Sequence, residues 1–243
     1  PLDGMRLVSP SGRTLEVPFH RGPADEDSYV APRLYYDAVI QQQAIDSGAC
    51  FEQAEVEEPL LADGRVVGVR ARRNGAMHEY RAPLVIAADG VTSTIMRHLR
   101  PEAEQHVDMH RAVALRAYVE GMELFPHKVE FFLYEEVLPG YAWIFSAGDD
   151  LANIGLGMRL DVFRRNKHNL KKMLRDFLAM PAIRSRLREG HIVRDVAIWQ
   201  LNFGSQKGLQ HAFDGALLVG DAAGFINPLT GGGLHNALIS GLL

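Results

Sequence analysis

The sequence predicts an α/β fold whose middle part is mainly β, of the α+β kind. Two short apolar runs, 84–88 and 216–219, each lead into an Asp-Gly or Gly-Asp pair and then into a helix-like segment, as buried parallel strands do. Between them, from 112 to 158, four segments rich in β-branched and aromatic residues follow one another without a long helix. Such a succession favours an antiparallel sheet, so we expect α/β segments at both ends of the chain to flank an antiparallel middle.

Individual strands are predicted from short runs of β-branched, aromatic and alternating apolar residues bounded by turn residues. The predicted strands are 5–8, 14–19, 51–57, 65–72, 78–81, 84–88, 113–119, 129–134, 141–146, 153–158, 192–201 and 216–219. A Pro-Ser-Gly turn joins the first two strands, and Asp-Gly and Asn-Gly pairs typical of tight hairpins join the third to the fifth.

Three helices are predicted from periodicity and from helix start and stop signals. One follows Pro32, which suits a first helical position, and stops at Gly48. The second, 170–179, places apolar residues on one side and charged residues on the other, and Pro181 ends it. The third begins at Leu234, directly after three glycines.

Composition excludes several classes of function. The net charge of -4 and the pI near 6.2 argue against a nucleic-acid-binding protein, and no basic block is present. A single cysteine, Cys50, excludes an internal disulfide, favours a reducing cytoplasm and is most simply a small buried apolar residue. The ten histidines show no ligand grouping on a helix, so we predict no metal site. No apolar run is long enough to span a membrane, and no signal peptide is present.

The segment LLVGDAAGFINPLTGGG, residues 217–233, carries the strongest chemical signal. Its strand ends at Gly220 and Asp221, and ligands of open α/β sheets lie beyond the carboxyl ends of the strands. An ionised aspartate only accepts hydrogen bonds, which suits sugar or ribityl hydroxyls. Three consecutive glycines then open a helix whose first amides stabilise negative charge on a ligand that lies against them.

A flavin fits both halves of this segment. Its ribityl chain needs a hydrogen-bond acceptor, and its reduced ring carries negative charge near N1 and the C2 carbonyl. The alternative is a glycine-rich turn that only joins a strand to a helix, and an isolated Gly-Gly-Gly suits that alternative equally well. The complete order of strand, Asp, small residues, Asn-Pro and glycine-capped helix favours the flavin.

Two weaker signals lie earlier in the chain. In LVIAADGVTSTIMR a strand ends at Asp89-Gly90, and Thr92 or Ser93 is a candidate cap for the next helix. In the first predicted helix an arginine at 33 and an aspartate at 37 are one turn apart. This pair is either a surface ion pair of little energetic consequence or an arginine that reaches a phosphate or ring edge while the aspartate fixes its position.

These motifs together resemble the flavoprotein oxidoreductases of the p-hydroxybenzoate hydroxylase fold. The segments that carry the resemblance are PRLYYDAVIQQQAIDSGA, LVIAADGVTSTIMR and LLVGDAAGFINPLTGGGLHNALISG, in matching order and spacing. A fourth segment, YAWIFSAGDDLANIGLG (141–157), is similar to the strand pair of the geranylgeranyl reductase family, in which an aromatic-x-Trp-x-Phe strand precedes an Asn-x-Gly-x-Gly strand. The resemblance extends from Pro32 over the rest of the chain.

The resemblance implies a partial FAD-binding Rossmann-like domain with an inserted antiparallel-sheet substrate domain. The implied division is 1–27 for strands of the substrate-side sheet, 28–105 for part of the FAD-binding domain, 106–210 for the substrate domain, and 211–243 for the Gly-Asp motif and helix of the FAD-binding domain. The implied FAD contacts are Arg33, Val56, Asp89, Gly90, Gly220, Asp221, Pro228, Gly231, Gly232, Gly233 and Leu234. Tyr141, Trp143 and Phe145 would line a lipid pocket, and no catalytic residue is assigned.

The sequence departs from the family at two points. The family usually has Phe-Pro after the tryptophan, whereas this chain has Phe145-Ser146, which would reshape the pocket. The family also begins with a GxGxxG turn that holds the ADP pyrophosphate, and this chain contains no such turn. Because it starts at Pro1 and stops at Leu243 within an apolar helix, we expect a fragment that lacks the N-terminal GxGxxG segment and the C-terminal region.

The resemblance implies an FAD-dependent reductase that saturates C=C bonds of a prenyl lipid of the geranylgeranyl type by hydride transfer from reduced flavin. NAD(P)H or another reductant would be the electron donor. The implied enzyme is cytoplasmic, acts on a hydrophobic small molecule, binds no nucleic acid and can contact a membrane peripherally, and its oligomeric state stays open. Two alternatives remain, namely a flavin monooxygenase or halogenase on the same scaffold and a truncated, non-catalytic fragment.

Overall fold

Both units of the fold are assembled from segments that lie far apart in the sequence. The computed structural model describes residues 1–19, 28–100, 107–148, 150–193 and 196–243. Unit 1 comprises Pro1–Ala49 and Val113–Trp199, and unit 2 comprises Cys50–Ala112 and Gln200–Leu243. The domain boundaries predicted at residues 27 and 105 fall outside the described residues.

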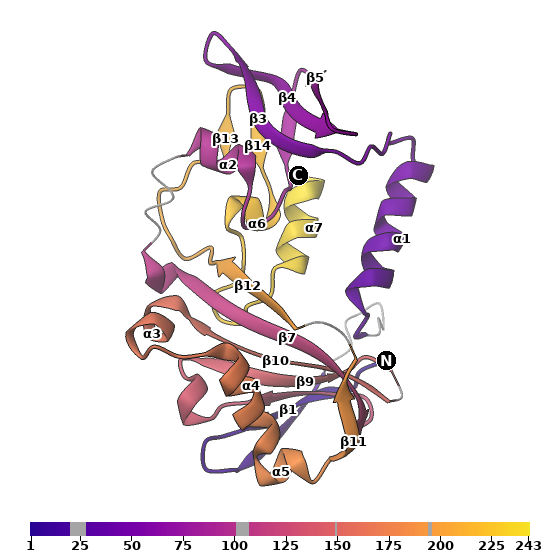
Figure 1. The fold of residues 1–243 in the computed structure, drawn as a ribbon, viewed down its shortest axis with the longest axis vertical. Coiled ribbons are helices and arrows are strands. Elements are labelled where there is room, and N and C mark those ends of the chain that lie inside the picture. The colour runs from indigo at the N-terminus through magenta and orange to yellow at the C-terminus, as the bar shows by residue number, and fades with distance from the viewer. Residues whose placement is uncertain (20–27, 101–106, 149, 194–195) are drawn as a thin grey trace. The chain divides into compact units, whose positions relative to one another are not determined.

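Unit 1 is built on a large, mainly antiparallel sheet (Figure 1). Its strands are β1 (Gly4–Val8), β2 (Thr14–Pro18), β7 (Arg111–Met122), β8 (Lys128–Phe132), β9 (Gly140–Ser146), β10 (Leu151–Arg159) and β11 (Leu187–Ile192), in the order β11-β7-β10-β9-β8-β1-β2. In addition, β12 (Ala197–Asn202) pairs with β7. The hairpin of β1 and β2 joins the sheet because β1 pairs in parallel with β8. The predicted antiparallel middle of the chain is confirmed.

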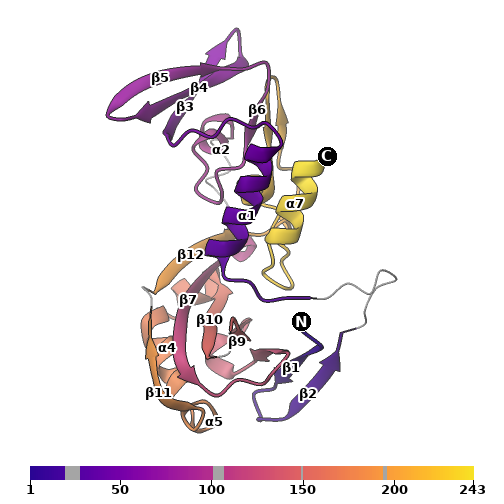
Figure 2. The ribbon, with the colours of Figure 1, turned by 90° about the vertical axis from the view of Figure 1, so that its right-hand side faces the viewer.

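Helices cover one face of this sheet and close its hydrophobic core (Figures 1 and 2). These helices are α3 (Leu160–Arg165), α4 (Leu170–Ala179) and α5 (Pro181–Arg184). The prediction for α4 is confirmed at both ends, and its apolar side, which includes Phe177, is buried in the core. Asn169 begins this helix, because its side-chain oxygen accepts the Lys172 N–H at 2.9 Å. Pro181 follows α4 as predicted, and it is also the first residue of α5.

Helix α1 (Arg33–Asp46) also belongs to unit 1, and its prediction is confirmed. None of its residues is buried, and several large apolar side chains, such as Leu34 and Val39, are exposed. Two short 3-10 helices are also present, one at Asp108–His110 in unit 2 and one at Glu135–Val137 in unit 1.

Unit 2 contains two three-stranded sheets. One is the antiparallel meander of β3 (Glu55–Ala62), β4 (Arg65–Arg73) and β5 (Ala76–Arg81). The other has the order β13-β14-β6, formed by β13 (Ala212–Phe213), β14 (Ala216–Leu218) and β6 (Val85–Ala87). β14 and β6 are parallel, which confirms the prediction made from their apolar runs. The helices of this unit are α2 (Thr94–Leu99), α6 (Gly220–Ala223) and α7 (Leu234–Leu242).

The structure corrects three sequence-based expectations. The strand predicted at 51–57 begins only at Glu55, because its ladder starts opposite Arg72 of β4. It continues through Pro59, which the ladder accommodates with register shifts on either side. The strand predicted at 192–201 corresponds to β12, which begins only at Ala197, whereas Ile192 is the last residue of β11; both strands pair with β7. Cys50, expected to be buried, is exposed.

Candidate cofactor-binding and substrate-binding sites

In unit 2, the two predicted Asp motifs follow neighbouring parallel strands. Ala87 at the end of β6 lies opposite Leu218 at the end of β14, so Asp89 and Asp221 come shortly after adjacent strand ends. The Asp89 carboxylate accepts the backbone N–H of Thr94 at 2.8 Å and therefore helps to begin α2. Ser93, one of the two predicted caps, accepts the Met96 N–H at 2.9 Å. The conformation of this turn is set by Gly90, whose φ is +79°.

Gly220 shapes the turn after β14. Its φ of +54° lies in the left-handed region, and an added Cβ would lie 3.1 Å from the Cβ of Ala237 on α7. Its N–H donates a hydrogen bond to the Ser240 hydroxyl of α7 at 3.0 Å. Strand β14 ends at Leu218, one residue before the predicted end. Asp221 lies in the first turn of the short helix α6. Gly220 fixes the distance between this turn and α7.

The structure brings Asp221 and the glycine run together. An added Cβ at Gly233 would lie 2.7 Å from Oδ1 of Asp221, so the carboxylate packs directly against the start of α7. The N-cap residue of α7 is Gly233, which has no side chain, and the helix begins at Leu234. A carboxylate and a helix N-terminus are thus adjacent. The carboxylate can accept hydrogen bonds from hydroxyls, and the backbone N–H groups of the helix can donate hydrogen bonds to a polarised carbonyl or ring.

The segment between these two groups is a tight turn built on Asn227. Its side-chain oxygen accepts the N–H groups of Leu229 at 2.9 Å and Thr230 at 3.1 Å. Gly231 has a φ of +69° and donates its N–H to the Asn227 carbonyl at 2.9 Å. Pro228 lies in this turn and is exposed. The Asn-Pro sequence therefore shapes the approach to the glycine run.

Arg100 is a buried arginine that supports the turn and that no sequence motif indicated. Its guanidinium donates to the carbonyl of Gln210 at 3.1 Å and reaches the carbonyl of Ala222 in α6 at 3.5 Å. Burial lowers the pKa of Arg100, and burial together with the Arg100 charge lowers the pKa of His211, whose Nδ1 lies 3.4 Å from the guanidinium. A positive group beneath the C-terminal carbonyls of α6 stabilises that short helix.

Two other predicted cofactor contacts lie elsewhere. Val56 on β3 is half-buried and packs against the small core of unit 2. Arg33 lies at the start of α1 in unit 1, and its Nε donates to Oδ1 of Asp37 at 2.8 Å. The predicted ion pair is confirmed, with both side chains more than half exposed, and such a pair contributes little to stability. The cofactor roles of Arg33 and Val56 stay predictions.

In unit 1, the predicted substrate residues lie together on one face of the sheet. Along β9, Ala142 and Ile144 are buried in the core beneath the helices, so Tyr141, Trp143 and Phe145 point to the opposite face. Phe131 of β8 joins them. These four residues are named here the aromatic cluster, and their ring centroids contact one another at 5.3–6.1 Å. No sequence motif indicated Phe131, although the alternation of β8 places it opposite Trp143.

Strand β10 fixes the position of Trp143 within the cluster. The indole Nε1 donates a hydrogen bond to Oδ1 of Asn153 at 3.0 Å. The six-membered ring covers Gly155, where an added Cβ would lie only 2.2 Å from Cζ2. Asn153 and Gly155 of the Asn-x-Gly-x-Gly pattern therefore position this ring. Burial raises the pKa of Tyr141, which keeps its phenol protonated at neutral pH.

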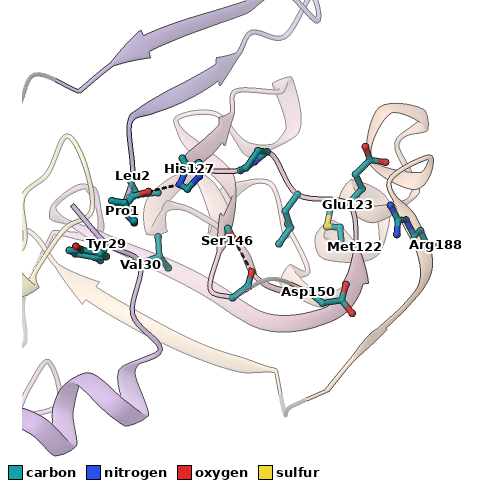
Figure 3. A pocket seen from close by; sticks show the side chains of 13 residues that line it. Pro1, Leu2, Tyr29, Val30, Met122, Glu123, His127, Ser146, Asp150 and Arg188 are labelled. Carbon is teal, nitrogen blue, oxygen red and sulfur yellow. Dashed lines mark hydrogen bonds between the residues drawn. The ribbon is translucent and has the colours of Figure 1, made fainter. Parts of the chain in front are cut away.

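Ser146, at the position where the resembled family usually has proline, lies at the end of β9 beside a pocket of about 490 Å³ (Figure 3). Its hydroxyl donates to the Gly148 carbonyl at 3.0 Å. The pocket mixes apolar residues such as Met122 with the charged residues Asp150 and Arg188. The aromatic cluster does not line it, so it is separate from the predicted substrate face.

Neither a candidate membrane-spanning helix nor a candidate metal centre occurs among the described residues. Within those ranges, no helix is both long and apolar enough to cross a membrane. The same residues contain no group of three or more His, Cys, Asp or Glu side chains arranged to hold a metal ion.

Comparison with known proteins identifies the family. The model of the geranylgeranyl reductase catalytic domain matches residues 108–196, which include the whole aromatic cluster. Over 97% of its length, the chain is 35% identical to digeranylgeranylglycerophospholipid reductase 2 of Methanopyrus kandleri. The chain belongs to the geranylgeranyl reductase family. A second member, digeranylgeranylglycerophospholipid reductase of Methanothrix thermoacetophila, is 33% identical over 99% of the chain.

Two solved structures share the fold of this chain. A geranylgeranyl bacteriochlorophyll reductase-like protein from Thermoplasma acidophilum superposes with a TM-score of 0.87 at 27% identity, over 99% of this chain and 59% of that one. A flavin-dependent halogenase shares the fold with a TM-score of 0.77 at 22% identity, over 97% of this chain and 44% of the other. The chain spans 57% and 59% of the lengths of the two curated reductases.

Proposed function

We propose that this chain forms the substrate-binding region and part of the cofactor-binding region of an FAD-dependent reductase that saturates C=C bonds of a prenyl lipid of the geranylgeranyl type. The aromatic cluster carries the proposal. Four half-buried rings on a rigid sheet form an apolar surface suited to a hydrocarbon chain, and they lie within the segment that matches the reductase catalytic domain.

The residues of unit 2 fit FAD. Asp221 would accept hydrogen bonds from the ribityl hydroxyls, and the glycine-led N-terminus of α7 would face the flavin ring where its reduced form is negatively charged. Gly233 lacks the side chain that would fill the space beside Asp221. When bound, FAD supplies a hydride from its reduced ring, and NAD(P)H or another reductant supplies the electrons.

The other predicted contacts belong to the same proposal. They are Arg33, Val56, Asp89, Gly90, Gly220, Pro228, Gly231, Gly232 and Leu234. The aromatic cluster would bind the prenyl chain, exclude water from it and hold it in one orientation. A substrate of this kind resides in a membrane, so a peripheral membrane contact is part of the proposal.

Anaerobic turnover of the full-length protein tests this function. With reduced flavin and a geranylgeranylated lipid, we expect products that are heavier by pairs of hydrogen atoms and a rate that does not require oxygen. We expect Trp143→Ala to lower kcat/KM by roughly a hundredfold, because it removes the largest ring of the cluster. Trp199→Ala, at an exposed tryptophan on β12, is the matched control and should change kcat/KM less than about threefold. Stoichiometric consumption of oxygen would instead indicate a monooxygenase or halogenase.

A further inference from the structure

Asn153 is a polar residue that contacts the aromatic cluster by accepting a hydrogen bond from one of its rings. In the antiparallel register of β9 and β10, Phe145 lies opposite Asn153 and Trp143 lies opposite Gly155. Asn153 is therefore the diagonal neighbour of Trp143 on the same face, a separation that a long aromatic side chain can span. The hydrogen bond of 3.0 Å from the indole Nε1 to the Asn153 Oδ1 uses this geometry.

Gly155 completes the restraint by leaving space beneath the indole. Cζ2 and Cη2 of the indole lie 2.2 Å and 2.6 Å from the place that a Cβ of residue 155 would occupy. The ring therefore lies against the backbone of β10. Asn153 accepts the hydrogen bond of its nitrogen, and the lack of a side chain at Gly155 lets its six-membered ring approach the strand. Two contacts along one edge of a rigid ring restrict its orientation.

The position of Trp143 affects the whole cluster. Its ring contacts Tyr141 at 5.9 Å and Phe145 at 6.1 Å between centroids, and both of these rings contact Phe131. A half-buried indole N–H without an acceptor has to find another one, usually through a change of rotamer. Loss of the Asn153 oxygen would therefore move the ring and change the surface that the cluster presents.

We propose that Asn153 is a positioning residue, which acts through Trp143 to set the depth and direction of the prenyl chain on the aromatic cluster. The inference rests on the proposed function for its substrate, whereas the hydrogen bond itself can be tested without any substrate. Asn153→Leu removes the acceptor at similar volume, and Asn153→Asp keeps an acceptor oxygen at the same place.

The first measurement is the indole N–H resonance of Trp143 in the full-length protein, assigned by its loss in Trp143→Phe. We expect Asn153→Leu to shift this resonance and to accelerate its hydrogen exchange, whereas Asn153→Asp retains its protection. The second measurement is turnover of a geranylgeranylated lipid. We expect Asn153→Leu to lower kcat/KM by roughly three- to tenfold, Asn153→Asp to restore most of the loss, and the double variant with Trp143→Phe to be no worse than Trp143→Phe alone.

Ile154→Val is the matched control, because Ile154 is buried in the core on the opposite face of the same strand. It lowers stability without touching the indole, so it should leave the resonance and kcat/KM close to wild type. An unchanged indole resonance in Asn153→Leu would overturn the inference, as would equal kinetic losses in Ile154→Val and Asn153→Leu. If the wild-type protein reduces no prenyl lipid, the proposed function fails, and the indole resonance still decides whether Asn153 holds Trp143.

Discussion

Units 1 and 2 build their candidate sites from different chemical groups. In unit 1, four side-chain rings stand on a large sheet whose opposite face is closed by a buried core. In unit 2, the candidate contacts are a carboxylate, backbone amides and glycines at positive φ, all on short elements with a small core. Unit 1 should therefore be sensitive to the size and support of its side chains, and unit 2 to the conformation of its backbone. The two sensitivities can be separated by substitution.

The largest expected effect on stability is at Glu130, a buried residue of strand β8 in unit 1. Its carboxylate is 2% exposed and accepts hydrogen bonds from Arg6 at 2.9 Å and from Arg186 at 2.6 Å, and both guanidinium groups lie over the ring of Phe125. Glu130→Ala leaves two positive charges close together without their shared partner. We expect a loss of about 3–5 kcal/mol in the free energy of unfolding, measured by denaturant titration.

Glu135→Ala is the control for this prediction, because Glu135 is an exposed glutamate of the same unit. It should change the free energy of unfolding by less than about 0.5 kcal/mol. Equal losses in the two variants would show that the buried cluster does not stabilise unit 1.

The second effect concerns the space beneath the aromatic cluster. A Cβ at Gly155 would clash with the Trp143 ring and would also lie 2.4 Å from the Leu115 carbonyl oxygen, which is backbone and cannot turn away. We expect Gly155→Ala to lower the free energy of unfolding by about 1–3 kcal/mol and to displace the indole. Gly157→Ala should cost less, because the nearest atom to its new Cβ would be the Ala114 methyl group at 3.1 Å. Indole fluorescence and thermal unfolding of both variants test this prediction, and a loss of stability in Gly157→Ala as large as that in Gly155→Ala would contradict it.

Local sequence patterns predicted the parts of both sites that depend on neighbouring residues. The span of α4 followed from its amphipathic period and from Pro181, and the parallel character of β14 followed from its apolar run. The association of Asp221 with the start of α7 was also indicated, because both lie within one continuous motif. In each case the physical cause acts over a few residues, so a short segment contains the necessary information.

Contacts between distant segments could not be predicted in this way. Glu130 lies 124 positions from Arg6, and Arg100 lies 110 positions from its partner Gln210. Neither residue belongs to a motif, and an exposed surface charge has the same sequence signature as a buried one. The hydrogen bond between Trp143 and Asn153 could not be predicted for another reason. It depends on the register of β9 and β10, and the periodicity of the sequence alone does not set that register.

The third effect tests the backbone dependence of unit 2. Gly220 has a φ of +54°, which an L-amino acid adopts at a cost of about 1–2 kcal/mol, and an added Cβ would also press on Ala237 of α7. We expect Gly220→Ala to lower the stability of unit 2 by this amount and to weaken FAD binding, measured by flavin fluorescence. Gly241→Ala is the control within α7, where a new Cβ meets open space and alanine favours the helix. A Gly220→Ala variant as stable as Gly241→Ala would show that unit 2 does not depend on the backbone conformation at Gly220.

The smallest effect is a pH dependence that should be confined to unit 2. Burial, and then the nearby charge of Arg100, hold the pKa of His211 below its usual 6.5, so the folded state favours the neutral imidazole. The stability associated with this group is fully present above pH 6.5 and is lost as the pH falls through the lower, folded-state pKa. We expect the Tm of the wild-type protein to fall more than that of His211→Gln between roughly pH 7 and pH 5. His78→Gln, at an exposed histidine on β5, should keep the wild-type dependence, and parallel Tm profiles for wild type and His211→Gln would contradict the assignment.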